Sequence, residues 1–119
     1  MLKTQLVEAL FTLASEKYQH QHIDNATVDE YETPNELLNY AFSSLENIRH
    51  KIIQQIPEFS YDECEVLMRY LYRLEYLCQK YDNLYKSDKW KDVMNESLNL
   101  LTYLGYSLDK FDEEGNLNQ

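Results

Sequence analysis

Apolar side chains recur along most of this chain at steps of three and four residues, the period of an amphipathic helix. Residues 2–19 carry the first such stripe, residues 34–56 the second, residues 61–85 the third and residues 88–104 the fourth. The stretches between them lack this period, and the longest covers residues 20–32. The pattern predicts four helices.

Two of these helices have clear start signals. Thr33 precedes Pro34, and Glu36 follows, so the Thr33 hydroxyl can accept from a free backbone N–H while Glu36 caps in return. Ser60 and Glu63 repeat this arrangement before the third helix. The short connections that follow favour antiparallel neighbours.

The end signals complete the predicted fold. Pro57 stops the second helix, and Gly105 suits a left-handed stop after the fourth. We expect residues 1–119 to form a single all-α domain, an up-and-down four-helix bundle with a short C-terminal extension. Residues 111–119 are expected to be frayed.

The third predicted helix carries two apolar stripes, so it should pack against two sides of the bundle. The second stripe consists of Val66, Tyr70, Leu77 and Leu84. Cys64 and Cys78 share this helix, where a rise of ~1.5 Å per residue separates them by roughly 21 Å. They cannot bridge each other, which favours a reducing compartment. The start of the chain does not read as a signal peptide, and no segment approaches the ~20 apolar residues of a membrane span. We therefore expect a cytoplasmic protein.

Acidic side chains outnumber basic ones by 21 to 11, which gives a formal charge of −10. Such a surface repels nucleic-acid phosphates and anionic membranes and attracts a basic protein. The acids gather in residues 21–36, 57–65 and 109–119. In an up-and-down bundle the last two segments meet at one end, where they predict a pole of net charge −7 that would dock the partner.

Tyrosine is also abundant, with eleven in the chain. Tyr72 and Tyr76 fall on the polar face of the third helix, and Tyr and Arg are common anchors of protein interfaces. Several of the acids have an alternative explanation, because acids in a first helical turn stabilise the helix dipole whatever the function. The candidate partner-binding residues are Asp24, Asp29, Glu30, Glu32, Glu58, Tyr61, Asp62, Glu63, Glu65, Arg69, Tyr72 and Tyr76.

No arrangement typical of catalysis is present in the sequence. It contains no Gly-rich phosphate loop, no CxxC and no HExxH motif. His20, His22 and Asp24 alone make a weak metal signal, because a second ligand pair at helical spacing is missing. We expect no cofactor, no bound metal and no enzymatic activity.

With its acidic patches at residues 24–36 and 58–65 and its surface tyrosines, the chain as a whole resembles the acidic helical immunity proteins that bacteria make against their own toxins, including those of contact-dependent inhibition systems. The resemblance is one of size, charge and class. It implies a cytosolic protein that binds a basic toxin domain, such as a nuclease, and covers its active site or substrate surface.

Two alternatives remain open. A phage-encoded anti-defence protein that mimics nucleic acid would carry carboxylates spaced along an elongated surface. A structural adaptor, or a homodimer, would use the second apolar stripe of the third helix.

Overall fold

The computed structural model describes residues 2–25, 32–55 and 58–118. These residues form five α-helices and three short helical turns, and an isolated antiparallel bridge joins Phe111 to Leu117. In chain order the elements are α1 (Leu2–Ala14), α2 (Glu16–Gln19), the π-helical turn η1 (His20–Asp24), α3 (Pro34–Ile53), α4 (Tyr61–Lys80), the 3₁₀ turn η2 (Leu84–Lys86), α5 (Trp90–Tyr103) and the 3₁₀ turn η3 (Leu108–Lys110). The predicted all-α class is confirmed.

The predicted N-cap hydrogen bond is present at both helix starts, and the reciprocal glutamate bond is present before α4, whereas at the start of α3 the Glu36 carboxylate contacts the Thr33 hydroxyl at 3.4 Å instead. Thr33 accepts a hydrogen bond from the Glu36 N–H at 3.2 Å, with Pro34 in the first turn of α3. Before α4, the Ser60 N–H donates to the Glu63 carboxylate at 2.9 Å, and the Glu63 N–H donates to the Ser60 hydroxyl at 3.2 Å. This reciprocal pair satisfies both backbone N–H groups.

Over the described ranges the chain forms five α-helices where the sequence predicts four, because the first predicted helix breaks at Ser15. Ser15 has extended backbone angles (φ −94°, ψ 110°), and its hydroxyl caps α2. The buried Gln19 amide donates to the carbonyls of Thr12 and Leu13 at 3.0 Å, and its oxygen accepts from the Trp90 indole N–H at 3.0 Å. The predicted up-and-down four-helix bundle is not confirmed.

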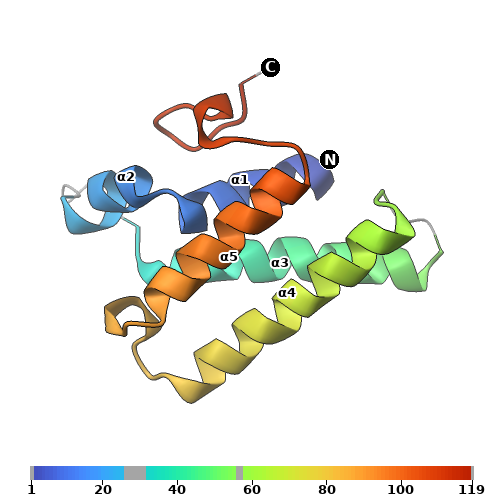
Figure 1. Cartoon of the computed structure of the whole chain (residues 1–119), viewed down its shortest axis with the longest axis horizontal. Coiled ribbons are helices and arrows are strands. Elements are labelled where there is room, and N and C mark those ends of the chain that lie inside the picture. Colours follow the sequence, from blue (N-terminus) through green and yellow to red (C-terminus); the bar gives the residue numbers. More distant parts are fainter. Residues whose placement is uncertain (1, 26–31, 56–57, 119) are drawn as a thin grey trace.

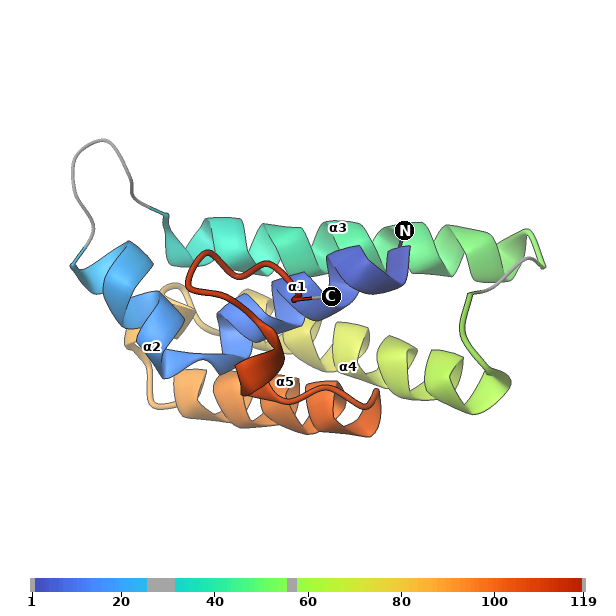
Figure 2. The same cartoon turned by 90° about the horizontal axis from the view of Figure 1, so that it is seen from above.

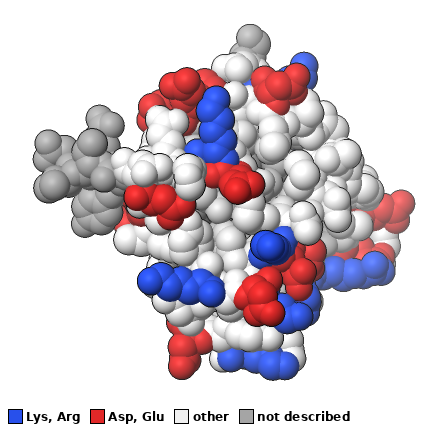
Figure 3. Space-filling view, turned by 60° about the vertical axis from the view of Figure 1, so that its left-hand side comes forward, with Lys and Arg blue, Asp and Glu red and all other residues white. Residues whose placement is uncertain are grey.

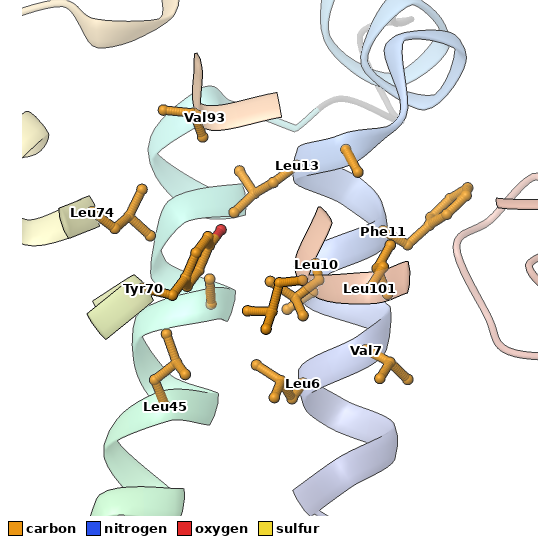
Figure 4. Packing of buried hydrophobic residues seen from close by; sticks show 14 of the residues in the cluster. Leu6, Val7, Leu10, Phe11, Leu13, Leu45, Tyr70, Leu74, Val93 and Leu101 are labelled. Atoms are coloured by element: carbon orange, nitrogen blue, oxygen red, sulfur yellow. The ribbon is translucent and has the colours of Figure 1, made fainter. Parts of the chain in front are cut away.

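The helices enclose one apolar core. α1 packs most extensively against α5 and α3, whereas α4 lies along one edge of the molecule and makes fewer contacts, with α3 and α5 (Figures 1 and 2). Side chains from all four long helices converge in the interior (Figure 4), among them Leu6, Leu10 and Leu13 of α1, Leu45 of α3, Tyr70 and Leu74 of α4, and Leu101 of α5.

The C-terminal segment is packed, contrary to the expected frayed end. Gly105 has φ +96° and ends α5 as predicted, after which the chain turns back across α1 (Figure 1). The Phe111 ring stacks on that of Phe11, with centroids 4.5 Å apart. The Leu117 N–H donates to the Glu8 carboxylate at 2.8 Å, so the tail (residues 106–118) is fixed to α1 at two points.

Candidate interaction surfaces

A groove of about 480 Å³ lies between α1 and α3, bordered by the tail. We call it the α1–α3 groove. The side chains of Ala9, Thr12 and Ser44 are small and buried, so the two helices leave a hollow above them. The longer side chains that line it are Gln5, Glu8, Tyr18, Tyr40, Asn47, Glu114 and Asn116.

Two tyrosines of this groove are hydrogen-bonded to carboxylates. The buried Tyr18 hydroxyl donates to Glu32, and the exposed Tyr40 hydroxyl donates to Glu36 at 3.4 Å. Burial raises the Tyr18 pKa, and the Glu32 hydrogen bond and the charges of Glu32 and Glu114 raise it further. Partial burial, with Glu32 and Glu36 adding to it, raises the pKa of Tyr40 to about 12. These carboxylates therefore give the groove a negative potential.

The tail contributes its acidic wall through one glycine and one aspartate. Gly115 has φ +83°, a backbone conformation that strains other residues, and a Cβ there would crowd the Tyr18 ring at 3.1 Å. The Asp112 carboxylate accepts from the backbone N–H groups of Glu114 and Asn116 at 2.9 Å each. This local turn places Glu114 beside the groove.

The predicted acidic pole does not form as expected, because the tail folds away from the connection between α3 and α4. Figures 1 and 2 show the tail over α1, with the end of α3 and the start of α4 at the far end of the molecule. The His22 ring contacts the Glu113 carbonyl oxygen at 3.0 Å, which places the tail acids beside η1 instead. The expected net charge of −7 at one end is therefore wrong.

The structure describes two of the four candidate acids that lie in the chain up to the start of α3, Asp24 and Glu32. Asp24 accepts from the Tyr85 hydroxyl at 2.9 Å and contacts the His20 ring at 3.0 Å. Glu32 is the partner of Tyr18 described above. Asp29 and Glu30 lie outside the described residues.

Of the other candidate residues, Glu58 lies just before α4 and the rest lie on it. Glu58, Tyr61 and Asp62 are exposed, and Glu63 caps the helix. Glu65 and Arg69, one turn apart, form an ion pair of 2.6 Å that is itself exposed. Tyr72 and Tyr76 are 58% and 49% exposed, so the sequence assigned them to the correct face.

The C-terminal half of α4 has the opposite electrostatic character to the groove. The Lys80 ammonium donates to the Tyr76 hydroxyl at 3.1 Å and lies 5.5 Å from the ring centroid. This bond, with the charges of Lys80, Arg73 and Lys89, lowers the pKa of Tyr76. Residues 69–91 carry six Lys or Arg against three acids. On the face shown in Figure 3, most basic side chains lie in the lower half and acidic ones predominate in the upper half.

The described residues contain no group of three or more His, Cys, Asp or Glu suited to hold a metal ion. Comparison with protein-family models, curated proteins and solved structures gives no match to this chain. Across the described ranges, no helix combines the length and apolar character that crossing a bilayer requires. Cys64 and Cys78 are both free thiols, and partial burial raises the pKa of each.

Sequence reasoning did not select the groove residues Glu8, Tyr18, Tyr40 and Glu114. Tyr18 fits the apolar stripe of residues 2–19, and Phe11 and the tail do cover it from one side. A partial signal existed at Glu36 and Tyr40, which are four residues apart and share one helix face. No local pattern indicated that the tail returns to α1.

Proposed function

We propose that this chain is a stoichiometric inhibitor of a basic protein, of the kind represented by bacterial toxin-immunity proteins, and that it binds that partner through the α1–α3 groove. The proposal is one of binding without catalysis. The observation that carries it is the groove itself, which Tyr18 and Tyr40 line together with the carboxylates of Glu8 and Glu114, while Tyr40 also donates to Glu36.

Such a groove suits a Lys or Arg side chain of the partner. A carboxylate rim attracts the cation, and a tyrosine ring such as the exposed Tyr40 offers a face for a cation–π contact worth about 0.5–1 kcal/mol at an exposed site. The formal charge of −10 would steer a basic protein toward the complex and make association depend on salt. A nuclease, which normally binds phosphates, presents a positively charged surface of the kind that this chain would attract.

The two alternatives have less support. A nucleic-acid mimic calls for carboxylates spaced along one elongated surface, whereas Glu8 and Glu114 line the groove and Asp62 and Glu63 lie in the first turn of α4. The apolar stripe needed by an adaptor is largely used inside the protein, because Tyr70, Leu77 and Leu84 are buried.

The test compares two triple variants that change the net charge equally. One is Glu8→Gln, Glu36→Gln and Glu114→Gln at the groove. The other is Asp62→Asn, Glu63→Gln and Glu65→Gln at the start of α4, the surface favoured by the sequence. The partner is the basic protein encoded beside this chain, and association is followed by biolayer interferometry at two salt concentrations.

We expect the groove variant to associate about tenfold more slowly and with a weaker salt dependence. The α4 variant should retain most of the association rate. An equal loss of association rate in both variants would mean that only the net charge matters and not its position. A larger loss in the α4 variant would place the docking surface at the start of α4. Absence of binding to any basic neighbour would overturn the proposal.

A further inference from the structure

The outer face of α4 bears charged and aromatic side chains that no other element covers. α4 lies at one edge of the molecule, with α3 and α5 on its inner side (Figure 1). Steps of three and four residues place the exposed side chains within an arc of about 100°. In chain order they are Asp62, Glu65, Arg69, Tyr72, Arg73, Tyr76 and Lys80. We call them the α4 stripe.

Charge is segregated along this stripe. Asp62 and Glu65 occupy its first part, whereas Arg69, Arg73 and Lys80 occupy the remainder. Asp62 and Lys80 form no ion pair with any other described residue, so both charges are available to a partner. The stripe has a net charge of +1 in a chain of net charge −10.

A helix that is acidic at one end and basic at the other is complementary to a second copy of itself in the antiparallel direction. We propose that two copies of this chain associate through the α4 stripe about a twofold axis, with Asp62 of each copy facing Lys80 of the other. In such an isologous contact every pair occurs twice. In this register Arg69 of one copy faces Arg73 of the other, and each arginine keeps a carboxylate of its own copy beside it, Glu65 for Arg69 and Glu96 for Arg73. Tyr72 lies close to the twofold axis, where an Arg beside a Tyr ring makes a favourable cation–π contact.

The rest of the molecule supports this orientation. The acids lie mainly elsewhere, so facing stripes keep the acidic surfaces of the two copies apart. The contact uses one helix from each copy, and it should be smaller than the ~1,200 Å² of a stable interface. The dimer is therefore weak and concentration-dependent. It uses a face other than the α1–α3 groove and does not depend on the proposed partner.

Sedimentation velocity of the pure full chain, from roughly 1 µM to roughly 1 mM, tests this association. Lys80→Glu leaves two acids facing each other at both ends of the contact, and Asp62→Lys leaves two bases. Each variant should raise the dimer dissociation constant about tenfold or more, because like charges across an interface are costly. Lys91→Glu, on exposed α5 surface, makes the same change in net charge as Lys80→Glu and should have little effect.

An equimolar mixture of Lys80→Glu and Asp62→Lys should recover dimerisation, since opposite charges then face each other at both ends of the mixed dimer. Recovery also shows that both variants are folded. If either variant loses the helical circular dichroism of the parent, Lys80→Gln and Asp62→Asn replace them, with an expected loss of about threefold each. A chain that stays monomeric over the whole range, or a mixture no better than its components, would overturn the proposal.

Discussion

The α1–α3 groove and the α4 stripe place the same residue type in opposite electrostatic surroundings. In the groove, Tyr18 and Tyr40 donate to carboxylates, and their pKa values are raised. On the stripe, Tyr76 accepts from Lys80, and its pKa is lowered. Tyrosine can serve both surfaces because its hydroxyl both donates and accepts. The count of tyrosines in a sequence therefore says little about the partner that each would meet.

The two surfaces also differ in how they are built. The groove combines α1, α3 and the tail, which are far apart in the sequence, whereas the stripe lies on one helix. Disrupting a long-range contact should therefore alter the groove and leave the stripe intact. Variants at the tail, at the contact between α4 and α5 and at the tyrosines test this difference.

Phe111→Ala should lower the free energy of unfolding by about 3 kcal/mol, because the ring is buried against Phe11. It should also release the tail, so that the Leu117 and Asn118 amides exchange faster with solvent. Urea unfolding and hydrogen exchange measure the two effects. The stripe tyrosines Tyr72 and Tyr76 should be unaffected.

Leu108→Ala is the matched control for this change. Leu108 also belongs to the tail but is 37% exposed, so we expect a loss below about 1 kcal/mol. A comparable loss in both variants would mean that the Phe111 stack does not hold the tail to α1.

Ser97→Ala tests the attachment of α4 to α5 and should cost about 2 kcal/mol. The fully buried Ser97 hydroxyl donates to the Val93 carbonyl at 2.6 Å, so the Tyr70 hydroxyl, also 2.6 Å away, donates to Ser97. Alanine leaves the Tyr70 hydroxyl without its partner in the core. Urea unfolding should show a smaller loss for Tyr70→Phe, about 1 kcal/mol, because Ser97 then keeps its bond to Val93. The reverse order would contradict this direction of donation.

Alkaline titration should distinguish the tyrosines of the two surfaces, with a smaller effect than the substitutions above. The Tyr76 pKa lies below its ordinary value of 10.0, whereas those of Tyr40 and Tyr85 are raised to about 12 by partial burial and by neighbouring carboxylates. Tyrosinate absorbance should therefore lose its earliest component in Tyr76→Phe and a late component in Tyr40→Phe. Identical titration curves for Tyr76→Phe and Tyr40→Phe would contradict the difference in pKa between the two surfaces.

The same shifts predict the direction of the change in stability with pH. The unfolded chain ionises its tyrosines near pH 10, whereas folded Tyr40 and Tyr85 keep their protons until about pH 12. The stability that these groups contribute is present below pH 10 and is lost between about pH 10 and 12. Urea unfolding across this range should show a smaller decline in Tyr40→Phe than in the parent.

Local patterns predicted the all-α class, both capped helix starts, the Gly105 stop and the exposed face that carries Tyr72 and Tyr76. They missed the break at Ser15, because the apolar stripe continues through it. The decisive interactions there are the three hydrogen bonds of Gln19, whose partners include Trp90, a residue distant in the sequence. The expected frayed tail and acidic pole were wrong for a similar reason, since Phe11 and Glu8 receive the tail.

The sequence by itself determined the helices and the order of residues along each face, because capping and the 3.6-residue period act over a few neighbouring positions. It therefore contained the α4 stripe in full. Only the tertiary structure decided the path of the tail and hence the α1–α3 groove, because ring stacking and hydrogen bonds between distant segments depend on how the helices pack. The packing therefore decided where the acidic side chains lie in space, whereas the sequence decided only how many there are.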